Sequence, residues 1–278
     1  MVTELPNPGR PVVMGILNVT PDSFSDGGRY TDLESAIRHG VQMTRDGADI
    51  VDVGGESTRP GATRVDPATE RQRVIPVIKR LAEHGVTMSV DTMRAEVAAA
   101  ALEAGASLIN DVSGGLADPD MAKVAATAGC PYILMHWRGH SRSMQQLATY
   151  TDVVREVRDE LSARIDDALR AGVSADRIVI DPGIGFAKTA EHNWRLSAHL
   201  DVFIELGFPV LLGTSRKSYL GQLLADPDGN PRPVDQRDDA TVATTVLAVD
   251  AGVWGVRVHD VRANVDAIKV WQATRSAR

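Results

Sequence analysis

The sequence of 278 residues predicts a single α/β domain folded as a (β/α)₈ TIM barrel, and three observations support this fold class. Short apolar runs alternate with amphipathic stretches from one end to the other, and eight such runs can be counted. Several amphipathic stretches end in a glycine-containing turn just before the next run, where a helix C-terminus is expected. No linker rich in proline, glycine or serine divides the chain. We place the barrel at residues 12–272, between an N-terminal extension at 1–11 and a C-terminal tail at 273–278.

The apolar runs are the predicted strands, and the amphipathic stretches between and after them are the predicted helices. The strands are expected at 12–17, 50–53, 87–90, 108–110, 132–135, 178–180, 210–212 and 256–258. The helices are expected at 32–45, 67–83, 94–104, 118–128, 153–171, 190–206, 236–250 and 261–272. Alternation of this kind implies parallel strands joined by right-handed crossovers. Eight units fit a closed barrel better than the alternative, an open doubly wound sheet, because no GxGxxG motif follows the first strand.

Composition restricts the class of partner. Apolar residues make up 43% and charged residues 24%, as in ordinary globular domains, and the formal net charge is −7. The absence of a sustained basic stripe argues against nucleic acid. No apolar run approaches the roughly 18 residues of a membrane span, and the first residues lack the apolar core of a signal peptide. With Cys130 as the single cysteine, an intrachain disulfide is impossible. We therefore expect a cytoplasmic protein that binds neither nucleic acid nor membrane.

Polar residues follow nearly every predicted strand. In a barrel, side chains just past the C-terminal ends of the strands face the active site. The residues in these positions are Asn18, Asp91, Asn110, Asp111, His136, Asp181, Lys217, Arg257 and His259, together with the glycine-rich segment 54–61. A lone Asp or Asn at a strand end is more often a cap of the following helix than a catalytic residue, and we assign Asp111 and Asp260 to that role. A polar residue at nearly every strand end, all on one rim, favours an active site.

Five segments resemble one known family. Residues 14–28 (MGILNVTPDSFSDGG) and 52–61 (DVGGESTRPG) resemble the two signature segments of the dihydropteroate synthases. Three later segments resemble further motifs of that family, namely 181–188 (DPGIGFAK), 213–218 (GTSRKS) and 257–260 (RVHD). The resemblance extends from about residue 12 to residue 269. It implies a (β/α)₈ barrel that forms a homodimer, needs Mg²⁺ and uses no organic cofactor.

The resemblance also implies a reaction. Members displace diphosphate from 6-hydroxymethyl-7,8-dihydropterin diphosphate with the amine of 4-aminobenzoate, a step of folate biosynthesis that sulfonamides target. The implied contacts with the pterin diphosphate are Asn18, Thr58, Asp91, Asn110, Asp181, Lys217, Arg257 and His259. Carboxylates can accept from the N–H edge of the pterin, and Lys217 can donate to its carbonyl side. The start of the helix after the last strand, near Arg257 and His259, suits the diphosphate.

The remaining implied roles concern the metal, the second substrate and catalysis. Asn18 resembles the family residue at the Mg²⁺–diphosphate position, and Mg²⁺ binds through few protein ligands when substrate phosphates complete its shell. The residues implied to bind 4-aminobenzoate are Phe24, Arg59, Pro60 and Ser218. No side chain is placed as a strong base, so we expect diphosphate to leave first, with electrostatic stabilisation and positioning supplying the catalysis. The expected catalytic residues are Asp26, Lys217, Arg257 and His259.

Three alternative functions are open to a barrel of this kind. A methyltransferase acting on a methylated folate would share the pterin pocket, but not the three residues Asn18, Arg257 and His259 suited to a diphosphate. A non-catalytic relative would have degenerate first and second loops, and both segments are intact here. A sugar-phosphate aldolase needs a Schiff-base lysine in an apolar setting, which Lys217 beside Arg216 does not provide. The segment 135–138 (MHWR) departs from the family pattern, and the roles of His136 and Arg138 stay open.

Overall fold

The computed structural model describes residues 4–20, 29–56, 64–140 and 144–277, and within them the strands form one parallel sheet of eight strands. The strands are β1 (Val12–Asn18), β2 (Ile50–Gly54), β3 (Met88–Asp91), β4 (Leu108–Asp111), β5 (Tyr132–Met135), β6 (Ile178–Asp181), β7 (Leu211–Leu212) and β8 (Gly255–Val258). Their order is β6-β5-β4-β3-β2-β1-β8-β7, and a parallel bridge between Ile180 and Val210 joins the two outer strands. The predicted (β/α)₈ barrel is therefore confirmed, and the open-sheet alternative is wrong.

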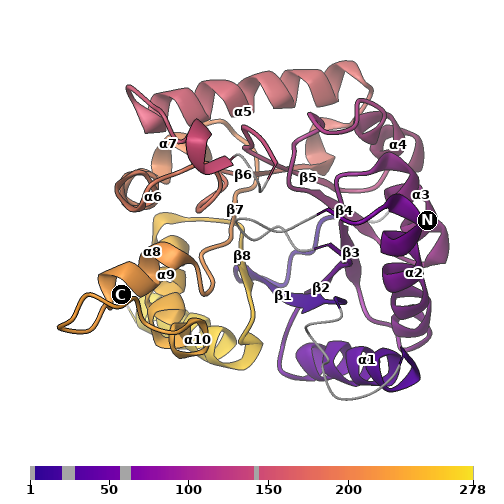
Figure 1. Ribbon diagram of the computed structural model, residues 1–278, viewed down its shortest axis with the longest axis horizontal. Helices are drawn as coiled ribbons and strands as arrows, with labels where there is room; N and C mark the ends of the chain where they lie inside the picture. The colour runs from indigo at the N-terminus through magenta and orange to yellow at the C-terminus, as the bar shows by residue number, and fades with distance from the viewer. Residues whose placement is uncertain (1–3, 21–28, 57–63, 141–143, 278) are drawn as a thin grey trace.

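Helices surround the ring of strands (Figure 1). They are α1 (Arg29–Arg45), α2 (Pro67–Glu83), α3 (Ala95–Ala104), α4 (Met121–Ala128), α5 (Val153–Arg170), α6 (Ala190–Ala198), α7 (Asp201–Ile204), α8 (Ser218–Leu223), α9 (Asp238–Ala251) and α10 (Val261–Ser276). The single helix expected at 190–206 is wrong: it is divided into α6 and α7, because His199 leaves the helical conformation at φ −128° and ψ 44°. The short helix α8 was not predicted, and α10 continues to Ser276, into the segment expected to be a tail. No described helix is long and apolar enough to cross a membrane.

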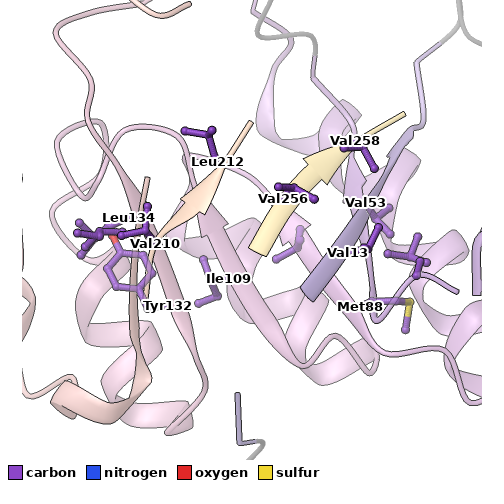
Figure 2. Packing of buried hydrophobic residues seen from close by; sticks show 14 of the residues in the cluster. Val13, Val53, Met88, Ile109, Tyr132, Leu134, Val210, Leu212, Val256 and Val258 are labelled. Atoms are coloured by element: carbon purple, nitrogen blue, oxygen red, sulfur yellow. The ribbon is translucent and has the colours of Figure 1, made fainter. Parts of the chain in front are cut away.

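Side chains along each strand alternate between the helices and the barrel interior, as the two-residue period of a strand requires. Residues such as Val13, Val53 and Val256 point outward and pack in the large core between strands and helices (Figure 2). The inward-facing residues form a second apolar cluster, which consists of Val12, Met14, Ile50, Leu108, Ile133, Val179 and Leu211. Because this apolar layer lies nearer the beginnings of the strands, the inward-facing positions that follow it lie toward the C-terminal rim.

The N-terminal segment covers the opposite end of the barrel. Leu5 and Trp254 pack against the inward-facing cluster, and the Trp254 Nε1–H donates to the Pro6 carbonyl oxygen at 3.3 Å. The Arg10 guanidinium forms two hydrogen bonds with the Asp49 carboxylate, at 2.7 and 3.0 Å. The apolar interior is therefore shielded from solvent on the side away from the polar rim.

Two glycines at helix ends give a matched test of this packing. Gly105 ends α3 at φ +116°, and a Cβ added there would lie 2.7 Å from the Ala82 Cβ on α2. Gly85 has φ +70°, and no atom lies within 4 Å of its Cβ position. Both Gly→Ala variants should lose roughly 1–2 kcal/mol from left-handed backbone strain, and Gly105→Ala should lose at least ~1 kcal/mol more from overpacking. Midpoints of urea unfolding measure this, and equal losses in the two variants would contradict the α2–α3 packing.

Candidate active site

Four neighbouring strand ends lie at one level of the barrel. The register pairs Asn18 with Gly54, Gly54 with Asp91, and Asp91 with Asn110. Gly54 adds no side chain at this level, and a Cβ there would lie 3.5 Å from an Asp91 carboxylate oxygen. Three of the predicted site residues are thus brought to one side of the rim, with no side chain at position 54 beside the Asp91 carboxylate.

Asp52 connects this group from below and was missed in the prediction from sequence. It is fully buried on β2, two residues past the inward-facing Ile50. Its carboxylate accepts from the Ser89 hydroxyl at 2.5 Å and from the Asn110 Nδ2 at 2.9 Å. The sequence did contain a signal, since a carboxylate inside an otherwise apolar strand needs buried partners.

Arg257 crosses from β8 to bridge two carboxylates. Its Nε donates to Asp52 at 2.6 Å and its Nη2 donates to Asp91 at 2.8 Å. Burial raises the pKa of Asp91 to about 7, while the neighbouring Arg257 cation opposes that rise. The carboxylates outweigh burial at Arg257 and raise the pKa of its guanidinium. A guanidinium has five N–H donors, so this cation anchors the rim and still has donors for a ligand.

Asp181 and Lys217 form the other half of the rim. A Cβ placed at Gly213 would lie 3.8 Å from the Asp181 Oδ2, 3.8 Å from the Lys217 Nζ and 3.8 Å from the Arg257 Cβ. Burial raises the pKa of Asp181, and the Lys217 cation opposes it. Burial also lowers the pKa of Lys217 to about 8, and the Asp181 carboxylate opposes that shift. Because position 213 is glycine, no side chain from this position comes between these groups.

The other described residues of the predicted site follow the C-terminal ends of β7 and β8. The His259 Nδ1 is 2.9 Å from the Ser215 hydroxyl, and the following Asp260 caps α10 by accepting from the Ala263 N–H at 3.2 Å. Ser218 is exposed at the first position of α8. The assignment of Asp260 to a helix cap is thereby confirmed, whereas Asp111 instead organises the turn after β4.

Seven further residues from the sequence analysis remain: five predicted site residues, and two whose roles were left open. Phe24, Asp26, Thr58, Arg59 and Pro60 lie outside the residues that the structure describes. His136 and Arg138, whose roles the sequence left open, both contact the Glu160 carboxylate on α5.

Asn18 is the candidate metal ligand. Within the described parts of the chain, no three His, Cys, Asp or Glu side chains converge on a common position for a metal ion. The Asn18 amide is half-buried at the end of β1 and has no hydrogen bond to another described residue. One hard amide oxygen at a rim suits Mg²⁺, which keeps waters and takes further oxygens from substrate phosphates. The residues present are therefore compatible with Mg²⁺ bound mainly through a substrate.

The arrangement suits a flat ligand with both donors and acceptors on its edge. Buried carboxylates at Asp91 and Asp181 can accept N–H groups, and the Lys217 ammonium can donate to a carbonyl group. Hydrogen bonds that involve an ionised partner contribute about 1.5–3 kcal/mol each, more than neutral ones. The cations at Arg257 and Lys217 also attract an anion. The rim can therefore bind a polar heterocycle that carries a negatively charged group.

Comparisons with known proteins show which proteins this chain resembles. Residues 14–259 match the model of a family described as pterin binding enzyme. A dihydropteroate synthase from Mycobacterium leprae is 57% identical over 259 residues, which cover 93% of this chain and 91% of that protein. A solved structure of a dihydropteroate synthase from Xanthomonas albilineans with 4-aminobenzoic acid is 47% identical and has a TM-score of 0.88. The match covers 96% of this chain and 94% of that chain. A structure of the Xanthomonas albilineans enzyme with 7,8-dihydropteroate is 44% identical, with a TM-score of 0.85 and coverage of 96% and 94%.

Proposed function

Because the chain belongs to the dihydropteroate synthase family, we propose that its polar rim holds the two substrates of that family's reaction in defined places. The chain is a transferase of folate biosynthesis. It condenses 6-hydroxymethyl-7,8-dihydropterin diphosphate with 4-aminobenzoate to give 7,8-dihydropteroate and diphosphate. The roles of single residues, the metal and the assembly state are the parts that we propose.

The pterin ring binds in the space beside Gly213. Asp91, Asn110 and Asp181 face its polar edge, and Lys217 donates to its carbonyl side. The observation that carries this proposal is the convergence of Asp181, Lys217 and Arg257 on the unfilled position beside Gly213. Each of the three buried carboxylates has a cationic neighbour, Arg257 for Asp52 and Asp91 and Lys217 for Asp181, so a neutral heterocycle can enter without leaving a carboxylate uncompensated.

The diphosphate binds beside the pterin, over the ends of β1 and β8. Arg257 has N–H groups left after its bonds to Asp52 and Asp91, and His259 and Asn18 lie at the neighbouring strand ends. Asn18 would hold Mg²⁺ through its amide oxygen, and the metal would supply positive charge that stabilises the leaving diphosphate. Thr58, outside the described residues, is a further predicted contact with this substrate.

The second substrate enters after the pterin. Ser218, exposed at the first position of α8, donates to the carboxylate of 4-aminobenzoate. Phe24, Arg59 and Pro60, in segments outside the described residues, shelter its ring. The amine then faces the exocyclic methylene carbon of the pterin.

The reaction begins with departure of diphosphate. An aromatic amine is a weak nucleophile, and the described rim offers no dedicated strong base. Departure of diphosphate before the amine attacks is therefore the easier route, because the electron-rich dihydropterin can delocalise the positive charge that remains. Arg257, His259 and Asn18 stabilise the departing anion, and Lys217 and Asp181 hold the ring. Asp26, outside the described residues, is the candidate carboxylate beside the cation. Preorganised charges of this kind can supply most of a rate enhancement.

The direct test measures dihydropteroate and diphosphate formed by the purified protein from the two substrates. We expect equal amounts of both products with Mg²⁺, and loss of activity after chelation that added Mg²⁺ restores. Undiminished activity in chelator would contradict the metal requirement. A second reaction omits 4-aminobenzoate and follows the pterin substrate alone. Slow release of diphosphate with hydrolysed pterin supports departure first, and an unchanged pterin substrate contradicts it.

The homodimer and the cytoplasmic location remain predictions. Two adjacent helices carry large apolar side chains that face solvent, Leu247 on α9 at 70% exposure and Val270 on α10 at 68%. Such side chains at the centre of a self-complementary face would support a dimer. Light scattering coupled to size exclusion should give twice the mass of the 29.8 kDa chain, and Leu247→Asp should shift it to the monomer.

The affinity for pterin diphosphate should depend on pH with a maximum between about 7 and 8. Burial raises the pKa of Asp91 to about 7, so protonation removes this acceptor and weakens binding as the pH falls below that value. Burial lowers the pKa of Lys217 to about 8, so the cation is lost and binding weakens as the pH rises above it. Direct titration without 4-aminobenzoate, from about pH 6 to 9, measures both limbs. Asp91→Asn should remove the acidic limb and Lys217→Met the alkaline one, and an unchanged profile in both variants would contradict these assignments.

A further inference from the structure

Lys188 is a buried cation that the proposed chemistry does not use. Only 3% of the residue is exposed, at the end of the loop that follows β6. Its Nζ donates to the carbonyl oxygens of Gly183 at 2.9 Å and Phe186 at 3.0 Å. The third neighbour of the Nζ is the His136 Nδ1, at 2.9 Å. A buried ammonium with all three of its donors directed at protein atoms is a structural anchor.

The loop that Lys188 anchors lies against Lys217. We call residues 183–188 the β6 strap. The Lys217 Nζ donates to the Ile184 carbonyl oxygen, and it lies 4.8 Å from the centroid of the Phe186 ring. A Cβ added at Gly185 would lie 2.8 Å from the Lys217 Cδ, so the backbone of the strap packs on the lysine stem. The position of the Lys217 ammonium therefore depends on the conformation of the strap.

The backbone of the strap needs this external support. Ala187 has φ +48°, a left-handed conformation that is strained for a residue with a side chain. Gly183 has φ +70°, and a Cβ there would overlap the carbonyl oxygen of His136. The bonds from Lys188 to the carbonyl groups of residues 183 and 186 span the strap on both sides of Ile184. Lys188 thus holds the strap from the interior while Lys217 contacts it from the rim.

Burial lowers the pKa of Lys188 well below its usual value, and the Asp181 carboxylate opposes this shift more than any other charge. His136 connects Lys188 to a second carboxylate. The His136 Nε2 lies 2.8 Å from a Glu160 carboxylate oxygen on α5, and Arg138 donates to the same carboxylate. Burial, together with the neighbouring Lys188 cation, lowers the pKa of His136 to about 4. A neutral imidazole can accept from Lys188 at Nδ1 and donate to Glu160 at Nε2. The segment that departs from the family pattern therefore connects the buried cation to a surface carboxylate.

We propose that Lys188 and His136 are positioning residues of the pterin site, which fix the β6 strap and through it place the Lys217 ammonium against the pterin ring. This inference rests on the proposed role of Lys217 in pterin binding. Neither residue touches the substrate. The Gly183 N–H of the strap also donates to the Asp181 Oδ1 at 2.7 Å, so most but not all of their contribution is expected to depend on Lys217.

A double-mutant cycle on the intact chain tests this dependence. The measurement is the direct affinity for the pterin diphosphate with Mg²⁺ and without 4-aminobenzoate. Lys217→Met and Lys188→Met should each weaken binding by about tenfold or more, the size expected for loss of a hydrogen bond to a charged group. The double variant should bind only slightly more weakly than Lys217→Met alone, far short of the product of the two single losses. Additive losses would overturn the proposal, because they would mean that Lys188 acts independently of Lys217.

Two variants at His136 provide a readout that does not depend on Lys188 itself. Asparagine can present an acceptor near the position of the Nδ1, whereas leucine cannot. His136→Asn should therefore keep most of the pterin affinity, and His136→Leu should lose about as much as Lys188→Met. Equal affinities of the two variants would contradict the role of His136 as an acceptor.

The controls separate this inference from the proposed function. Lys79→Met removes an exposed lysine of α2 away from the rim and should leave the affinity unchanged. Normal pterin binding by Lys217→Met would overturn the proposed pterin site. Weak binding by Lys217→Met together with normal binding by Lys188→Met would overturn the strap inference alone.

Discussion

Replacement of Asp52 by alanine is expected to reduce kcat/KM for the pterin diphosphate by at least about a hundredfold and to destabilise the fold. The carboxylate is fully buried and accepts from Ser89, Asn110 and Arg257. Its removal leaves the Arg257 cation without one of its two acidic partners. Breaking a buried charge pair on one side costs about 3–5 kcal/mol, because the remaining charge is uncompensated.

Two further variants separate the effect of Asp52 on the position of the site residues from its effect on the stability of the fold. Asp52→Asn keeps the shape and one acceptor oxygen but lacks the charge, so it should fall between the wild-type chain and Asp52→Ala. Ser89→Ala removes a single donor to the same carboxylate and should cost only about 1 kcal/mol. Urea unfolding and steady-state kinetics are measured on the same samples. Wild-type kcat/KM in a folded Asp52→Ala variant would exclude Asp52 as the residue that places Arg257 and Asn110.

Replacement of Asp181 by alanine is expected to abolish measurable pterin binding while the chain stays folded. Asp181 lies at the end of β6, and its Oδ2 lies near the unfilled position beside Gly213. Two hydrogen bonds from pterin N–H groups to an ionised carboxylate would contribute about 1.5–3 kcal/mol each, which corresponds to a loss of roughly a hundredfold or more. Calorimetric titration with the pterin diphosphate gives the affinity directly.

A nearby acidic residue serves as the matched control. Asp176, whose side chain is 71% exposed, lies in the short turn before β6. Asp176→Ala should bind the pterin diphosphate as the wild-type chain does. Retained affinity in Asp181→Ala would remove the carboxylate from the proposed pterin contacts, and reduced affinity in both variants would indicate a general effect of negative charge.

The architecture could be predicted from sequence because its signals are local. Apolar runs that alternate with amphipathic stretches indicated all eight strands, and the C-terminal ends of those runs placed Asp91, Asn110 and Asp181 on one rim. The boundaries were less accurate, as the division of the helix at His199 and the extension of α10 to Ser276 show. The reaction was indicated by the family motifs, because five segments that follow different strands all resemble the same family.

The support beneath the site could not be predicted in the same way. Asp52 is a buried acceptor only because Ser89, Asn110 and Arg257 lie beside it, and they follow it in the chain by 37, 58 and 205 residues. Lys188 likewise was an unassigned member of a motif until its contacts with the β6 strap were known. Such roles depend on contacts between distant segments, which neither periodicity nor spacing encodes.

The most direct measurement is a crystal structure of this chain with the pterin substrate bound. The central claim predicts that the ring lies at the C-terminal rim, with its polar edge on Asp91, Asn110 and Asp181 and its carbonyl side on Lys217. The diphosphate should then extend toward the ends of β1 and β8. A ring bound elsewhere, with those four side chains left in contact only with protein and solvent, would contradict the claim.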